Sequence, residues 1–205
     1  PQTGVVIHQL GSSETFLRST GVASKKFDFV DAWFPHGYKD STIDEHTQFF
    51  DHWLKGDDNG IMDGPPVRVQ VRTGNGGHYV LEEQEWPLAR TQWTPLHLDA
   101  GSGTLSTEAP AQAAQASFTA MKDGLSFSTP PFEQEMEFTG PVTLRLWISS
   151  STPDADLFAV LRVFDPEGQE ATFVGAHERV PMALGWLRAS HRKLDLARSQ
   201  PWRPW

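Results

Sequence analysis

The sequence predicts a mainly β protein, a β-sandwich of the jelly-roll type, preceded by a short α/β segment. After residue 63 the chain holds about nine short apolar runs, separated by turns at the spacing typical of sandwiches and jelly rolls. Before that point, strand-like and helix-like segments alternate, an order typical of parallel α/β structure. We therefore divide the chain into 1–63, the α/β segment, and 64–205, the β domain, which we expect to be incomplete.

Within the α/β segment, residues 42–56 predict an amphipathic helix. Ser41 or Thr42 is expected to be the N-cap, with Glu45 completing a capping box. Lys55 and Gly56 are expected to end the helix, because glycine readily takes a left-handed backbone conformation. One apolar face recurs at near-helical spacing and comprises Ile43, Phe49, Phe50, Trp53 and Leu54. Upstream, residues 5–10 and 25–34 are expected as strands, with a shorter helix over 13–20 between them.

In the β domain, residues 67–72 alternate valine with polar residues, and a turn rich in glycine and asparagine joins them to 78–83. This pattern predicts a β-hairpin. A second hairpin turn is predicted at Asp165–Gly168, because proline fixes φ and glycine accepts positive φ. Residues 109–116 are expected as a surface loop. Further strands are expected at 94–99, 116–120, 125–129, 136–150, 157–165, 171–176 and 186–194.

Composition limits the function classes. The 205 residues are 38% hydrophobic, which is enough for a core, and the net charge of −9 disfavours binding to nucleic acid or to an anionic membrane. No apolar run reaches the length of a membrane span, so we expect a soluble protein. The absence of cysteine excludes disulfides and thiol nucleophiles. It leaves the compartment open, with the cytoplasm slightly favoured.

The sequence shows no nucleophile elbow of the form G-x-S-x-G, and no cofactor motif. His46 and His52 stand six apart and so lie on different faces of the helix, which disfavours a shared metal. A calcium loop is suggested only by the composition of Asp57, Asp58, Asn59 and Asp63, and a solvated loop is the favoured interpretation. The paired acids Asp154 and Asp156 are expected to serve as hydrogen-bonded turn residues or in an interdomain contact.

The strongest single catalytic candidate is His36. It follows the predicted strand 25–34 and precedes the predicted helix 42–56. In open α/β sheets, catalytic groups gather just beyond the carboxyl ends of strands. A histidine at this position could act as the general base of a hydrolase, although a polar loop histidine remains the alternative.

The run of residues 32–72 resembles the segment that carries the triad histidine in the X-Pro dipeptidyl-peptidase and cocaine-esterase-like (CocE/NonD) serine hydrolases. Residues 85–99, 139–170 and 185–195 resemble the C-terminal, galactose-binding-like jelly roll of that family. The resemblance covers nearly the whole chain. It implies that 1–63 is the end of an α/β-hydrolase core and that His36 is the triad histidine. The usual aromatic and histidine neighbours are replaced by Phe34 and Pro35.

The same resemblance implies a partner, the remaining α/β-hydrolase core, on the same chain or on a separate one. The nucleophilic serine and the oxyanion hole belong to this part of the core, which these 205 residues do not contain. Asp28 and Asp31, in the strand before His36, are poor substitutes for the triad acid. We therefore expect no ester or peptide hydrolysis from this chain alone. The expected substrate of the whole enzyme is a small ester or an X-Pro peptide.

Two other functions stay open. A carbohydrate-binding module could use its tryptophans as a stacking platform, with candidates Trp86, Trp93, Trp147, Trp186, Trp202 and Trp205. An assembly domain could instead pair its exposed strand edges with another chain, including a second copy of itself in a homo-oligomer.

Overall fold

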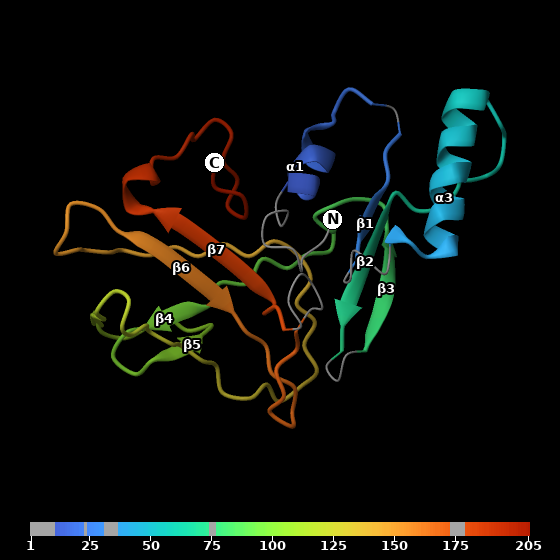
Figure 1. The fold of residues 1–205 in the computed structure, drawn as a ribbon. Coiled ribbons are helices and arrows are strands. Elements are labelled where there is room, and N and C mark those ends of the chain that lie inside the picture. Colours follow the sequence, from blue (N-terminus) through green and yellow to red (C-terminus); the bar gives the residue numbers. More distant parts are fainter. Residues whose placement is uncertain (1–10, 23, 31–36, 74–76, 173–178) are drawn as a thin grey trace. The chain divides into compact units, whose positions relative to one another are not determined.

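The computed structural model describes residues 11–22, 24–30, 37–73, 77–172 and 179–205. The described chain is β-rich, as predicted, and its strands and few helices are labelled in Figure 1. The chain divides into two compact units, residues 1–89 with 140–205, and residues 90–139. The first unit holds helix α1 (Gly11–Arg18), strand β1 (Phe27–Phe29), helix α3 (Asp40–Phe50) with its π-helical extension η2 (Asp51–Lys55), and strands β2 (Val67–Arg72), β3 (His78–Glu83), β6 (Asp156–Leu161) and β7 (Ala183–Arg188).

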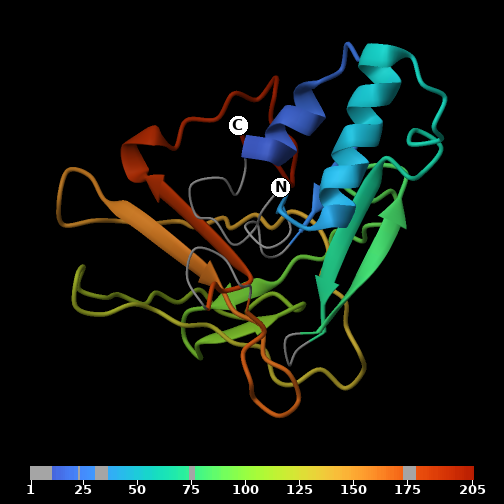
Figure 2. The ribbon, with the colours of Figure 1, turned by 45° about the vertical axis from the view of Figure 1, so that its right-hand side comes forward.

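A three-stranded sheet in the order β1-β2-β3 organises the first unit. β1 runs parallel to β2, and β2 and β3 form the predicted antiparallel hairpin, whose tip at 74–76 lies outside the described residues. Figures 1 and 2 both show α3 alongside this sheet. The β1–β2 pairing crosses residue 63, and the division into 1–63 and 64–205 stays a prediction.

The core of this sheet is small and aromatic. Val67 is fully buried, and Phe27 and Val69 are nearly so. The Phe27 ring stacks on Phe16 of α1 with centroids 4.7 Å apart, and Phe29 packs against Trp86 at 4.4 Å. The alternation in β2 explains this arrangement, because successive side chains in a strand point to opposite faces. Val67 and Val69 therefore enter the core, and Arg68 lies on the other face.

The helix predicted at 42–56 is confirmed, with α3 and η2 spanning Asp40–Lys55 and Gly56 closing it at φ +81°. The predicted capping box is wrong. The N-cap is Lys39 and makes no side-chain cap, and the Glu45 carboxylate binds Arg68 instead. The predicted shorter helix at 13–20 is also confirmed, as α1.

The predicted apolar face of α3 and η2 is not buried by the described part of the chain. Ile43, Phe50, Trp53 and Leu54 are all exposed, with Leu54 at 79%. The helical period thus forms an apolar stripe, but no other described segment covers it.

β6 and β7 form an antiparallel pair in which Phe158 stands opposite Trp186. The Asp165–Gly168 turn after β6 is formed as predicted, with the Gly168 N–H donating to the Asp165 carbonyl oxygen at 3.0 Å and Gly168 at φ +79°. The 3₁₀ turn η3 (Ala189–His191) follows β7.

The second unit contains one antiparallel pair, β4 (His97–Asp99) and β5 (Thr104–Ser106). β4 falls in the strand predicted at 94–99, whereas β5 lies in no predicted strand. Residues 109–116 are exposed, as expected of a surface loop.

Several predicted strands are not formed. Residues 116–120 and 136–150 have no strand pairing, and 125–129 has only an isolated bridge at Ser128. Trp147, in the middle of one of these runs, is 95% exposed. An apolar run becomes a strand only when another strand satisfies its backbone, and no described segment pairs with 136–150. Residues 5–10 and most of 171–176 lie outside the described residues.

Charged groups join α1 to the C-terminal end of the chain. Arg203 donates through Nε to Glu14 Oε1 at 2.6 Å, and Arg18 donates to Glu14 Oε2 at 3.0 Å. The guanidinium of Arg18 lies 4.0 Å from the Trp205 ring centroid. Burial alone would raise the pKa of the Glu14 carboxyl, but the bonds from Arg203 and Arg18 outweigh it and hold the pKa below its usual 4.5.

Replacing Val67 with alanine tests the core. Val67→Ala should lower the free energy of unfolding by about 2 kcal/mol, because it removes two buried methyl groups and leaves a cavity. Val80→Ala in β3 of the same sheet is the matched control, since Val80 is half exposed. Urea unfolding measures both. Equal destabilisation by the two variants would contradict the assigned core.

The Glu14 cluster predicts a pH dependence of stability. Since the pKa of Glu14 is lower in the folded chain than in the unfolded one, its stabilisation is present above the unfolded value and is lost as the pH falls through the folded value. Glu14→Gln should therefore lower the melting temperature at pH 7 and flatten its fall below about pH 4, close to the ordinary glutamate pKa. Thermal unfolding between pH 3 and pH 7, roughly the range in which carboxylates titrate, measures this. Parallel curves for the two proteins would contradict it.

Candidate functional site

The predicted catalytic residue His36 lies outside the described residues, so its role stays a prediction. The structure does describe the two elements on either side of it. β1 ends at Phe29 and α3 begins at Asp40.

A cluster of charged groups joins these two flanking elements to β2. Arg68 of β2 donates through Nε to Asp28 Oδ1 at 2.7 Å and through Nη2 to Asp28 Oδ2 at 2.5 Å. The same Nη2 lies 2.6 and 2.7 Å from the two carboxylate oxygens of Glu45 on α3. One guanidinium therefore holds a carboxylate from β1 and another from the helix.

The register of the sheet creates this cluster. Asp28 is the direct partner of Arg68 in the parallel ladder, and Glu82 is its partner in the antiparallel one. All three side chains therefore share the face opposite the Val67 core. Sequence reasoning missed Arg68, because the alternation in β2 predicts its face but neither its neighbours in the sheet nor the approach of α3.

The electrostatics of the cluster favour the charged arginine. The hydrogen bond from Arg68 to Asp28 raises the pKa of the guanidinium, partial burial opposes this, and the bond to Glu45 raises it further. Both carboxylate oxygens of Asp28 accept from Arg68, so this carboxylate is already engaged. This agrees with the expectation that Asp28 is a poor substitute for a triad acid.

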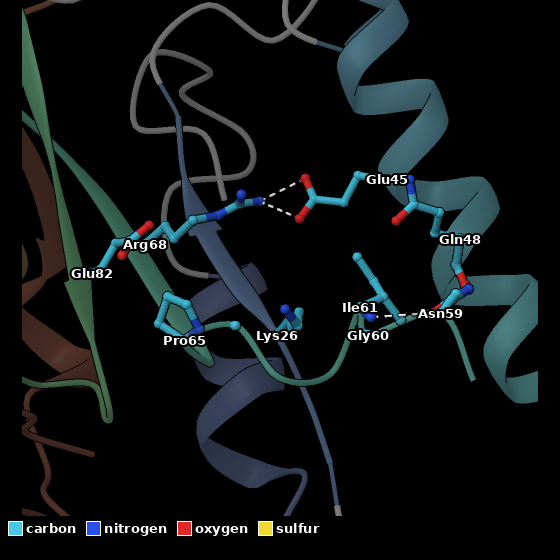
Figure 3. A pocket seen from close by; sticks show the side chains of 10 residues that line it. Lys26, Glu45, Gln48, Asn59, Gly60, Ile61, Pro65, Arg68 and Glu82 are labelled. Carbon is cyan, nitrogen blue, oxygen red and sulfur yellow. Dashed lines mark hydrogen bonds and ion pairs between the residues drawn. The ribbon is translucent and has the colours of Figure 1, made fainter. Parts of the chain in front are cut away.

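A pocket of about 300 Å³ opens beside Arg68 and is shown in Figure 3. Lys26 and Arg68 supply positive charge, and Glu45 and Glu82 supply negative charge. Among the described residues, neither a serine nor a histidine lines this pocket, so the lining by itself offers no nucleophile and no imidazole base. The lining residues are Lys26, Glu45, Gln48, Asn59, Gly60, Ile61, Gly64, Pro65, Arg68 and Glu82.

Asn59, in the loop considered for calcium, makes hydrogen bonds to the backbone. Its side-chain amide donates to the Gln48 carbonyl oxygen at 2.7 Å, and its side-chain oxygen accepts from the Ile61 N–H at 3.2 Å. His52 Nδ1 lies 2.9 Å from the Asp57 carbonyl oxygen. Within the described ranges, no three histidine or acidic side chains gather closely enough to hold a metal ion.

The acids of the Asp154 segment are hydrogen-bonded turn and strand residues, the first of their two predicted roles. Asp154 accepts from the Ser190 N–H at 2.9 Å and from its hydroxyl at 2.6 Å. Asp156 binds Arg188 through both oxygens at 2.7 and 2.9 Å, across the β6–β7 ladder. The hydrogen bond from Arg188 lowers the pKa of the Asp156 carboxyl.

The tryptophans proposed as a sugar platform occupy separate environments. Trp86 packs in the aromatic core, Trp205 lies against Arg18, and Trp186 stands on β7.

No helix in the described portion of the chain is long and apolar enough to cross a membrane.

Comparison with known proteins finds relatives that are named as esterases or hydrolases. The chain is 30% identical over 162 residues to the cocaine esterase of a Rhodococcus species, covering 60% of this chain and 28% of the esterase. It is 25% identical over 187 residues to a putative serine esterase of Mycobacterium bovis, covering 74% and 27%. A crystal structure of a CocE/NonD family hydrolase from Staphylococcus aureus superposes with a TM-score of 0.81 at 27% identity, covering 97% of this chain and 37% of that one. The chain thus spans between 27% and 37% of the length of each of these relatives.

The sequence profile of the X-Pro dipeptidyl-peptidase C-terminal non-catalytic domain matches residues 59–204. This range includes β2 with Arg68 and every later described strand, and it leaves β1, α3 and η2 upstream. The chain therefore belongs to the CocE/NonD and X-Pro dipeptidyl-peptidase family of hydrolases and contains its C-terminal non-catalytic domain.

Proposed function

We propose that this chain is the C-terminal portion of a serine hydrolase that cleaves an ester or X-Pro peptide bond through an acyl-serine intermediate. His36 would be its general base. Two facts support the proposal: His36 falls in the sequence between β1 and α3, and the relatives of the chain are named as esterases.

The chemistry would follow the usual division of roles in a catalytic triad. His36 would take the proton from the serine hydroxyl as its oxygen bonds to the substrate carbonyl carbon, and then give that proton to the leaving group. Water would release the acyl group in a second step of the same kind. The serine, the oxyanion hole and the triad acid would come from hydrolase sequence beyond these 205 residues. Without them, His36 has no nucleophile to activate, so we expect the isolated chain to be inactive.

The C-terminal region has a structural role in this proposal. Residues 64–205 would complete a jelly roll packed against the hydrolase core and would help to shape the substrate cleft, with 1–63 belonging to the core. The exposed apolar stripe on α3 and η2 supports this division, since a helix with such a stripe is ordinarily covered by further protein.

The proposal is tested by activity-based labelling. A fluorophosphonate probe, which reacts with activated serines, should not label the purified 205-residue chain, and the chain should not hydrolyse p-nitrophenyl butyrate. The full natural polypeptide that contains the chain should do both. Labelling that maps to a serine of the isolated chain would contradict the proposal.

His36→Ala in the full polypeptide should lower kcat/KM for the same ester by at least 10³-fold, because the general base is lost, as in other triads. His46→Ala and His52→Ala are matched controls on the neighbouring helix and should leave kcat/KM within about twofold, as substitutions outside the triad. A His36→Ala enzyme with normal activity would remove His36 from the mechanism.

A further inference from the structure

We infer that Arg68 is a positioning residue, through which the first strand of the C-terminal non-catalytic domain holds the segment that carries the catalytic histidine. This inference rests on the proposed role of His36. It assigns to a domain described as non-catalytic a direct part in arranging the catalytic centre.

The two carboxylates that Arg68 binds lie on either side of His36 in the sequence. His36 is eight residues after Asp28 and nine residues before Glu45. Asp28 lies on the strand that enters this segment, and Glu45 lies in the helix that leaves it. A single guanidinium therefore links the strand that precedes His36 in the sequence to the helix that follows it.

Arg68 contacts both carboxylates with a defined geometry. The contacts to Asp28 are bidentate, with two donor nitrogens on two oxygens, and Nη2 also reaches both oxygens of Glu45. A guanidinium can do this because its donors are fixed in one plane, whereas a lysine ammonium is a point charge without that fork. The arrangement therefore restrains direction as well as distance between β1 and α3.

Arg68 also places a positive charge between the two carboxylates. Asp28 and Glu45 both approach one cation, so removing it would leave two carboxylates facing each other. Glu82 lines the same pocket and adds a third acid, while Lys26 is the other cation there. Repulsion among these acids would push β1 and α3, the elements on either side of His36 in the sequence, apart.

Other restraints on α3 are weaker in kind. Its N-terminus has no side-chain cap, and much of its apolar face is exposed in the described chain. The bond between Arg68 and Glu45 is therefore a main polar link from the helix to the sheet, and it comes from the region matched by the non-catalytic domain.

The test uses Arg68→Gln and Arg68→Lys in the full natural polypeptide, with p-nitrophenyl butyrate as substrate. Arg68→Gln should lower kcat on the order of 10- to 100-fold with KM changed less than about threefold, since misplacing a catalytic group by about 1 Å has effects of this size. Arg68→Lys should fall between Arg68→Gln and the parent, because it keeps the charge but loses the fork.

The matched control is Arg162→Gln. Arg162 makes a similar bidentate pair with Glu170, at 3.0 and 2.7 Å, in the hairpin that follows β6. It should leave kcat unchanged. Circular dichroism and melting temperature establish that each variant is folded.

Adding Asp28→Asn and Glu45→Gln to Arg68→Gln separates geometry from repulsion. The triple variant removes the acids' mutual repulsion without restoring the link. Its melting temperature should therefore be higher than that of Arg68→Gln, while its kcat stays as low. If kcat recovers together with the melting temperature, the effect of Arg68 is only structural and the inference is overturned.

The two proposals fail in different ways. If His36→Ala abolishes turnover while a folded Arg68→Gln enzyme keeps its kcat, the positioning role is wrong and the proposed function stands. If His36→Ala keeps full activity, the proposed function itself is wrong, whatever Arg68→Gln does.

Discussion

The parallel pairing of β1 with β2 is the constraint on which the rest of the first unit depends. It sets Phe27 beside Val67 on one face of the sheet and Asp28 beside Arg68 on the other. The first contact builds the aromatic core with α1, and the second provides the cation that reaches Glu45 on α3. One register therefore determines where both helices lie against the sheet.

The energies on the two faces of this sheet differ in kind. Burial of Val67 and Phe27 is non-directional and scales with the apolar area removed from water. The Arg68 cluster is about one-third exposed, so solvent screens it and its contribution to stability is modest. Its importance lies in geometry, since two charge-assisted contacts from one planar group restrict the relative placement of a strand and a helix. This difference is why loss of Arg68 is expected to affect catalysis more than folding.

The sequence boundary of the non-catalytic domain falls between two strands of one sheet. The profile match begins at residue 59, so β1, α3 and η2 precede the non-catalytic domain, while β2 belongs to it. Yet β1 and β2 share one sheet, and Arg68 is bonded to residues on both flanking elements. The boundary between the two regions is thus a boundary in sequence that passes through one hydrogen-bonded structure. A substitution in the non-catalytic domain can for this reason affect the strand and helix that precede it.

The sequence by itself determined the local elements and the family. The 3.6-residue period predicted the helix found at Asp40–Lys55, and the valine alternation with the glycine turn predicted the β2–β3 hairpin. The motifs around His36 carried the resemblance to the hydrolase family. Only the tertiary structure decided that Arg68 joins Asp28 and Glu45, that Glu45 is not a capping residue, and that residues 136–150 lack strand pairing. The physical reason is that period and turn chemistry act between near neighbours in the chain. Strand register, ion pairing and strand formation instead depend on partners tens of residues away, which a local pattern does not specify.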